Sequence, residues 1–526
     1  MSAQKAVKKN EEKSYDEVPY ESFCYPQTHP HHLNTMATLF KLKTPNFKEA
    51  RILEIGCASG GNLTPIAVAY PKAKLVGIDI SSEQIEQANK RKEALGLKNV
   101  EFKQEDVLNL KASSKKDQFD YIICHGVFSW VPENVRKKIF EVCNDMLSPN
   151  GVAVISYNAL PGWNAVRSLR DMMLYHSNRF ENPNDKVAQS RLLLNFLSEN
   201  VPEGNVAYKS VIESEINLLQ KVNNSYLYHD HLESENTQFY LNDFVAMARE
   251  SGLDYVGDTN IASMYLGNMP PKVMEVLKAI DDVVAQEQYM DFITNRRFRS
   301  SILCKQGAVI NRNIDKEQIM DYYLNFNPAV QVIGFDTSKD ITFRVGAAEF
   351  KTHEPVASTL FMELAANGIK PISAKDLVER TRVKLGVEKT DAIEKALIES
   401  GLQLMLMGYI NIYSDSPEYV STLSEKPVAN PIARFEAQSN LALSLTNSFG
   451  TAVATDITAN ILVRNLDGTK TKEDLFAVLV EAIEDGTLKL NRDGNPIEDK
   501  KERDLLLTQI LDTVLNKLAE NAFLIG

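Results

Sequence analysis

The segment with the clearest chemical meaning is ARILEIGCASGGN, residues 50–62. Its short apolar run followed by glycines is typical of a buried parallel strand that ends in a tight turn before a helix. Gly56 and Gly60 allow the backbone to turn sharply and to approach a ligand closely. The helix that follows offers free N–H groups and the positive end of its dipole. This pattern predicts a loop that binds the polar part of a nucleotide-like cofactor.

Carboxylates near this loop indicate which cofactor it binds. Asp79 ends a second apolar run, LVGIDIS, where an acidic residue typically bonds ribose hydroxyls. Glu54 lies directly before the loop, and Ala58 stands where a dinucleotide-binding G-x-G pattern has its middle glycine. A carboxylate at the mouth of the loop repels a pyrophosphate but suits a cofactor whose loop-facing end carries an ammonium. S-adenosylmethionine (SAM) has such an end, together with a sulfonium and an adenosine.

Two further strands complete the expected binding edge. Residues 99–110, NVEFKQEDVLNL, predict a strand followed by Asp106, placed where the adenine amino group needs an acceptor. Residues 119–126, FDYIICHG, predict a fourth strand. Its C-terminal end is expected to face the methyl group, because ligands sit at the strand C-termini of open α/β sheets. The alternative interpretation treats the acidic residues as unrelated caps of separate turns.

The elements that must position these residues predict an α/β protein. We expect a Rossmann-like, doubly wound SAM-binding sheet, then a mostly helical middle domain, then a C-terminal winged-helix-like α+β region. Long helical patterns begin after Pro161, and two helix–helix–strand units with small β-wings follow Asn327-Pro328. The expected boundaries are a flexible tail over 1–20, the SAM-binding domain with an N-terminal helical lid over 21–165, the middle domain over 166–328 and the C-terminal domain over 329–526.

The sequence resembles the class I SAM-dependent methyltransferases in these motifs. A closer resemblance, over about residues 20–305, is to a bacterial subfamily with a methyltransferase regulatory domain behind the SAM domain. It is carried by the segments YPQTHPHHLNTMATLF, HGVFSWVP, SYNALPGW and NRRFRSSILC. The subfamily includes the rickettsial-type lysine methyltransferases that act on outer-membrane protein. The resemblance implies SAM as methyl donor, S-adenosyl-L-homocysteine as product and a lysine-bearing protein as substrate.

A lysine acceptor sets demands on the site. Its amine must lose a proton, since its free pKa is about 10.4, and a desolvated channel favours the neutral form. Aromatic faces tolerate the sulfonium and the cationic product. The candidate catalytic residues are His125, Trp130, Tyr157, Asn158 and Trp163. The candidate cofactor-binding residues are Tyr25, His29, Glu54, Gly56, Cys57, Ala58, Gly60, Asn62, Asp79, Ile80, Asp106, Val107 and His125. The alternative for His125 is an indirect hydrogen-bonding role, and for the tryptophans, Tyr157 and Asn158 it is core packing. No catalytic base is required in principle, since water can take the proton.

Composition limits the function classes. The 526 residues carry a net charge of −12 without a basic bias, which disfavours nucleic acid as partner. The acidity suits lysine-bearing protein segments, and the equal alternative is that it only keeps the protein soluble. The five cysteines are scattered, without C-x-x-C spacing, which favours a reducing compartment. No apolar run approaches the roughly 18 residues of a membrane span. We expect a cytoplasmic protein without a metal site, whose C-terminal modules serve substrate docking or homodimerisation.

Three rival functions stay open at this point. The first is a SAM-dependent methyltransferase that acts on a small molecule or a different protein. The second is a SAM-binding regulatory protein without activity. The third is a nucleic-acid methyltransferase, which usually shows a D/N-P-P-Y/F motif after the fourth strand, where this chain has CHGV at 124–127. The basic run Arg296, Arg297 and Arg299 is expected to pair with carboxylates in a domain interface.

Overall fold

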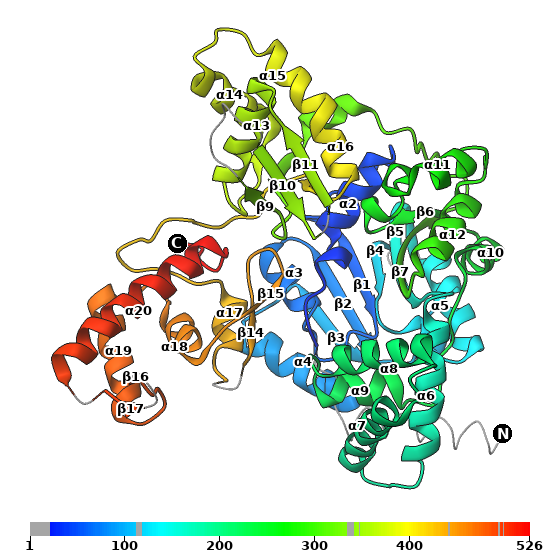
Figure 1. Cartoon of the computed structure of the whole chain (residues 1–526), viewed down its shortest axis with the longest axis horizontal. Helices are drawn as coiled ribbons and strands as arrows, with labels where there is room; N and C mark the ends of the chain where they lie inside the picture. The colour runs from blue at the N-terminus through cyan, green and yellow to red at the C-terminus, as the bar shows by residue number, and fades with distance from the viewer. Residues whose placement is uncertain are drawn as a thin grey trace.

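The computed structural model describes residues 22–111, 118–333, 341–346, 348–439, 442–492, 495–497 and 499–526. The tail expected over residues 1–20 lies outside these ranges. Within them a central α/β structure is surrounded by a helical cluster and two smaller α+β units (Figure 1). The expected fold class, a Rossmann-like sheet followed by helical and winged-helix-like regions, is confirmed.

A seven-stranded sheet forms the centre of the molecule, in the order β3-β2-β1-β4-β5-β7-β6. Its strands are β1 Arg51–Ile55, β2 Lys74–Asp79, β3 Val100–Gln104, β4 Phe119–Cys124, β5 Leu147–Asn158, β6 Leu253–Asp258 and β7 Phe298–Lys305. The first five run parallel, whereas β7 is antiparallel to both β5 and β6. Because β1 and β4 are neighbours without being consecutive in the chain, a ligand crevice is expected outside their C-terminal ends.

Helices cover both faces of this sheet (Figure 1). Strand residues alternate between the faces, so that Ile52 joins one core and Leu53 the other. The first core is shared with α2 Pro30–Leu39, α3 Leu63–Ala69 and α4 Ser82–Ala94. The second core is shared with α5 Glu133–Met146, α10 Leu241–Glu250 and α12 Val283–Thr294. This double cover fixes the sheet edge that carries the predicted binding residues.

Four helices form a separate cluster between β5 and the last two strands. They are α6 Trp163–Ser177, α7 Pro183–Asn200, α8 Val206–Leu219 and α9 Asn224–His231. Their own core includes Leu169, Leu194 and Ile212. The short helix α11, Pro271–Leu277, lies between β6 and α12. The sequence predicts a middle domain over residues 166–328, but β6 and β7, which lie in this range, belong to the central sheet. The sequence did not indicate this, because a long helical insertion separates these two strands from β5.

The chain beyond β7 begins with a three-stranded sheet in the order β12-β8-β13. Its strands are β8 Tyr323–Phe326, β12 Ile372–Ser373 and β13 Ile410–Tyr413. The associated helices and wing strands are α13 Pro355–Ala366, α14 Ala374–Leu385, α15 Asp391–Ala396, α16 Leu402–Leu406, β9 Gln331–Ile333, β10 Ile341–Val345 and β11 Ala348–Thr352. Since β8 pairs with β13, this unit begins before Asn327-Pro328, where the sequence suggested a boundary.

A second small unit completes the chain. Its elements are α17 Pro431–Glu436, β14 Ser444–Thr446, β15 Ala452–Ala454, α18 Ile457–Asn465, α19 Lys472–Glu484, β16 Asn491–Arg492, β17 Asn495–Pro496 and α20 Lys500–Glu520. It contacts the central part through an ion pair of 3.4 Å between Arg91 on α4 and Glu436 on α17. None of the helices in the described ranges is long and apolar enough to cross a bilayer. The five cysteines are buried free thiols.

Candidate active site

The turn after β1 has the backbone that the glycine pattern predicts. Gly56 and Gly60 have φ values of +74° and +75°, in the left-handed region that favours glycine. A Cβ on Gly56 would stand 2.4 Å from a methyl group of Val127, so this position has no room for a side chain. Ala58 also has a positive φ, +45°, and its N–H donates to Asp79 over 2.9 Å. The turn thus presents main-chain atoms at the C-terminal edge of the sheet.

Asp79, which ends β2, and Asp106, which follows β3, hold the adjacent turns in place. Asp79 also accepts a hydrogen bond of 3.0 Å from the N–H of Ser81. Asp106 caps the short 3-10 helix Val107–Asn109 by accepting 2.9 Å from the N–H of Leu108. Both carboxylates therefore lie at the strand ends where ribose and adenine were expected. Their contacts with the cofactor, and those of Ile80 and Val107, stay predictions.

Glu54, at the end of β1, has an unfilled acceptor. The residue is 4% exposed, and its Oε1 accepts 2.7 Å from Asn62 Nδ2. Its buried Oε2 has no hydrogen-bond partner among the described residues. Burial raises the pKa of Glu54 to about 8, against the opposing effect of the Asn62 hydrogen bond. An ammonium group would supply the missing donor and balance the charge. The site therefore fits the amino-acid end of S-adenosylmethionine.

The segment before α2 closes over the glycine turn as the expected lid. The N–H of Tyr25 donates 2.9 Å to Asn62 Oδ1, and Asn62 Nδ2 donates 3.0 Å to the hydroxyl of Thr28. The N–H of Gly61 donates 2.8 Å to the hydroxyl of Ser22. Asn62 thus connects the lid to Glu54 on β1, so its predicted cofactor role has a second, structural component.

His29 lies away from this turn. It precedes α2, where its Nδ1 accepts 3.3 Å from the N–H of His31, and its ring centroid is 5.4 Å from that of Tyr70 after α3. Both histidine rings line a cleft of about 1200 Å³ between the lid, β13 and the last unit. Burial lowers the pKa of His29 to about 3, so the ring is neutral. The structure therefore does not bring His29 together with Glu54 and Asp79.

An aromatic wall, formed by Tyr25, His125 and Phe298, stands at the end of β4. The ring centroid of His125 lies 4.2 Å from that of Tyr25 and 5.9 Å from that of Phe298. Burial lowers the pKa of His125 to about 4, so the imidazole is neutral at pH 7. Phe298 begins β7 directly opposite Asn158, the last residue of β5, and is 42% exposed. The sequence did not indicate Phe298, because its place depends on pairing between distant strands.

Unfilled polar atoms gather at three neighbouring strand ends. Within the described ranges, Glu54 Oε2, His125 Nδ1 and Asn158 Nδ2 are buried and lack hydrogen-bond partners. They follow or end β1, β4 and β5, which are adjacent in the sheet. Buried polar groups in folded proteins are nearly always paired, so such a cluster indicates that a ligand completes it. A bound cofactor and its methyl acceptor are the groups that this edge is built to receive.

The remaining candidates divide between the site and the core. Trp130 and Trp163 meet edge to face with centroids 6.2 Å apart, beyond the ends of β4 and β5. Tyr157 instead faces the core: it is 1% exposed, stacks on Phe244 at 4.0 Å and hydrogen-bonds a serine of β7. Neighbouring strand residues point to opposite faces, so Tyr157 cannot face the same side as Asn158. The thiol of Cys57 is also buried in the core.

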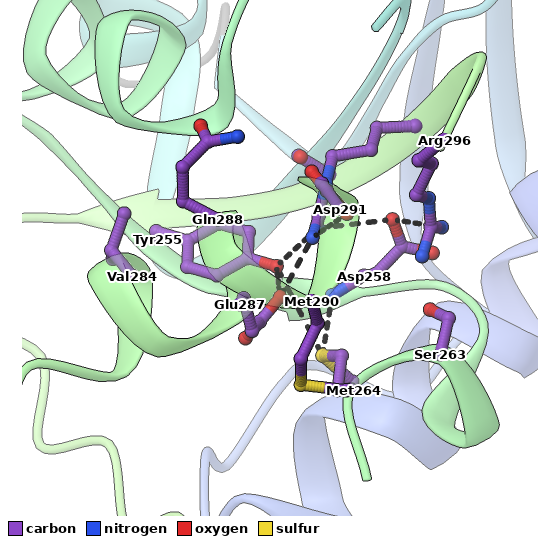
Figure 2. A network of polar contacts seen from close by, with 12 residues as sticks. Tyr255, Asp258, Ser263, Met264, Val284, Glu287, Gln288, Met290, Asp291 and Arg296 are labelled. Carbon is purple, nitrogen blue, oxygen red and sulfur yellow. Dashed lines mark hydrogen bonds and ion pairs between the residues drawn. The ribbon is translucent and has the colours of Figure 1, made fainter. Parts of the chain in front are cut away.

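A network of buried ion pairs surrounds Arg299, the second residue of β7 (Figure 2). The fully buried Arg299 donates to Asp291 over 2.7 and 2.9 Å and to Glu287 over 3.1 Å. Arg296 donates 2.9 Å to Asp258, a carboxylate that Figure 2 shows between it and the rest of the network. The pairing expected for the basic run is therefore confirmed. It fixes the strand end that carries Phe298.

A substitution at His125 separates ring packing from hydrogen bonding to the amine. His125→Phe keeps an aromatic ring between Tyr25 and Phe298 but removes the nitrogen that can accept a hydrogen bond. We expect kcat to fall by about tenfold, the scale of one hydrogen bond that orients the amine, while SAM affinity measured by calorimetry stays within about twofold of the wild type. An unchanged kcat would show that the imidazole only packs. The matched control is Phe180→Leu, at a ring beyond the C-terminal end of α6.

Comparison with known proteins agrees with this geometry. Family models match residues 46–224 ("Methyltransferase domain"), 223–305 ("Predicted methyltransferase regulatory domain") and 425–523 ("PKMT, C-terminal winged helix domain"). The Rickettsia prowazekii protein RP789 is 42% identical over 97% of this chain and 93% of its own length. The structure of PKMT2 from Rickettsia typhi in complex with AdoHcy superimposes with a TM-score of 0.88, at 34% identity, covering 97% of this chain and 100% of PKMT2.

The sheet, the glycine turn and the unfilled carboxylate define a class I SAM-dependent methyltransferase. The chain belongs to the rickettsial-type PKMT family, with a methyltransferase domain, a regulatory domain and a C-terminal winged-helix domain.

Proposed function

We propose that this methyltransferase modifies lysine side chains of a protein substrate, in particular an unfolded outer-membrane protein. The observation that carries the proposal is the aromatic wall at the end of β4, with a neutral, half-buried His125 in its middle. An amine acceptor needs such surroundings, because burial among aromatic rings disfavours the charged ammonium. The likeness to PKMT2, a rickettsial lysine methyltransferase, supports the same acceptor. A cytoplasmic location and a homodimer stay predictions.

The protein's own groups have a limited set of tasks in this reaction. When bound, SAM supplies a methyl group on a positively charged sulfur, which an amine can attack directly. Glu54 and the glycine turn hold the cofactor, and the lid segment at Tyr25 excludes water from it. Tyr25 and Phe298 favour the neutral amine and tolerate the cationic product. His125 Nδ1, neutral and without a partner among the described residues, accepts a hydrogen bond from the neutral amine, while the proton that the lysine loses passes to water. Positioning alone can supply about 7–11 kcal/mol of the barrier reduction.

The test is methyl transfer from labelled SAM to an unfolded fragment of outer-membrane protein, read by mass spectrometry. We expect methylated lysines at several sites, and no transfer to the same fragment after its lysines are blocked by acetylation. Label on another residue type would discard the amine assignment. SAM binding without any transfer would discard the substrate and favour a small-molecule acceptor or a regulatory role.

A further inference from the structure

A polar cavity of about 440 Å³ lies beside α6, outside the cofactor region. Its lining includes Leu160 and four residues of α6, with Asn236 and Thr237 of the segment between α9 and α10. The N–H of Thr237 donates 2.8 Å to the main-chain oxygen of Ser129, one residue before Trp130. The cavity therefore adjoins the segments that follow β4 and β5, where the methyl acceptor is expected.

The face of α6 that begins at the active site also reaches this cavity. Trp163, Arg167 and Arg170 are spaced by four and three residues, so they lie on one side of the helix. Trp163 meets Trp130 at the site end of this face, and the two arginines line the cavity. One side of the helix thus connects the aromatic pair with the cavity.

Two residues that line the cavity each carry a buried donor without a hydrogen-bond partner among the described residues. Arg170 is 6% exposed; its Nη2 donates to the main-chain oxygens of Glu233 and Ser234. Its Nη1 lies 3.8 Å from the exposed carboxylate of Asp171. In the described part of the chain its Nε has no partner, and neither has Asn236 Nδ2. A buried donor left unpaired costs about 1–3 kcal/mol, and more when charged, so these groups indicate an absent acceptor.

We propose that this cavity receives an aspartate or glutamate side chain of the protein substrate, near the lysine that is methylated. The inference rests on the proposed function and adds a specificity determinant to it. A carboxylate offers two oxygens, which match a guanidinium N–H and an amide N–H. Arg167, Arg170 and Asp171 together carry one positive charge at the cavity, which balances a carboxylate but not a doubly charged phosphate. Because the carboxylates of Glu233 and Glu235 also act on Arg170, the site selects a carboxylate through the two donors that it satisfies rather than through a positive field.

The test compares two sets of lysine peptides that differ only by glutamate or glutamine at one position near the lysine, with the position scanned on both sides. At one of these positions we expect kcat/KM to be about tenfold higher for the glutamate peptide, as a single charge-assisted hydrogen bond predicts. Arg170→Gln is expected to abolish this ratio while the glutamine peptide is still methylated. Equal kcat/KM for both peptides of every pair in the wild type overturns the proposal.

Controls separate the possible failures. Arg179→Gln is the matched variant, because Arg179 follows α6 and lies outside the cavity; it should keep the wild-type ratio. A ratio that persists in Arg170→Gln also overturns the assignment, and Asn236→Leu repeats the test if the arginine variant does not fold. If neither peptide of any pair gains methyl groups on lysine although SAM binds, the proposed function fails rather than this inference.

Discussion

Glu54→Gln is expected to weaken SAM binding by about a hundredfold or more, the scale on which a buried charge partner is lost. The substitution keeps an oxygen for the hydrogen bond from Asn62 Nδ2. It replaces Oε2, which has no partner among the described residues, by an NH2 group. This group cannot accept a hydrogen bond from the cofactor's ammonium, so the change removes the charge pairing but keeps the contact with Asn62. Isothermal titration calorimetry measures the affinity directly. The matched control is Glu49→Gln, at an exposed carboxylate paired with Lys72, which should change the affinity by less than about twofold.

The same carboxylate gives SAM binding a defined pH dependence. Burial raises the pKa of Glu54 to about 8, so below that pH the group is protonated and must release a proton before it can pair with an ammonium. Wild-type affinity should therefore rise about tenfold per pH unit between pH 6 and 8, with one proton released on binding.

Glu54→Gln cannot release this proton, so its affinity for SAM should not change between pH 6 and 8. Above pH 8 the wild type should lose affinity, because the cofactor's amino group, of pKa about 8 by analogy with an α-amino group, becomes neutral, whereas Glu54→Gln, which has no charge to pair with it, should show no such loss. Titrations in two buffers of different ionisation enthalpy count the protons. A wild type that is flat from pH 6 to 8 would show that Glu54 is already ionised and that the cofactor is held in another way.

The cofactor edge was predictable because its signals are local. Glu54 and Gly56 are separated by one residue in the sequence, and Asp79 follows a strand that its apolar run makes plain. The lid contact is different: Asn62 reaches Tyr25 over 37 positions of the chain. No sequence spacing predicts that contact, although both residues were candidates for cofactor binding.

The residues on the acceptor side of the site were harder to predict from the sequence, because pairing between distant strands brings them together. Phe298 reaches the site only through the antiparallel register of β7 with β5, which brings it opposite Asn158. Tyr157 and Asn158 were both singled out as neighbours in sequence, yet alternation along a strand separates their side chains. His29 follows the same lid as Tyr25, but the start of α2 turns its ring toward Tyr70. Sequence patterns locate strand ends, whereas the facing of each residue depends on tertiary packing.

Arg299→Met is expected to lower the free energy of unfolding by about 3–5 kcal/mol, the scale found when one partner of a buried ion group is removed. The variant leaves Glu287 and Asp291 buried without the guanidinium that both now contact. Chemical denaturation measures the change. The control Arg249→Met removes a guanidinium that pairs with Asp254 at 3.1 Å near the surface, and it should cost less than about 1 kcal/mol.

The loss should depend on pH in a direction that the buried carboxylates dictate. Burial already raises the pKa of Glu287 and of Asp291, with Arg299 opposing it. Without the arginine these values rise further above those of the unfolded chain. A carboxyl whose pKa is higher in the folded than in the unfolded chain contributes its full share to the free energy of unfolding at low pH. That contribution is lost as the pH rises through the folded pKa. The deficit of Arg299→Met should therefore be smaller at pH 5 than at pH 8, whereas a deficit caused by lost packing alone would not change.

A compensating variant shows whether lost charge pairing or lost packing lowers the stability of Arg299→Met. Glu287→Gln and Asp291→Asn, added to Arg299→Met, remove the uncompensated charges while the side-chain volumes stay nearly the same. We expect most of the lost stability to return, since buried ion groups replaced by neutral ones of similar size are often tolerated. Turnover should recover less, because Arg299 directly follows Phe298 at the start of β7 and fixes that end of the aromatic wall. Full recovery of turnover together with stability would contradict a positioning role for the network, and would confine its effect to the fold.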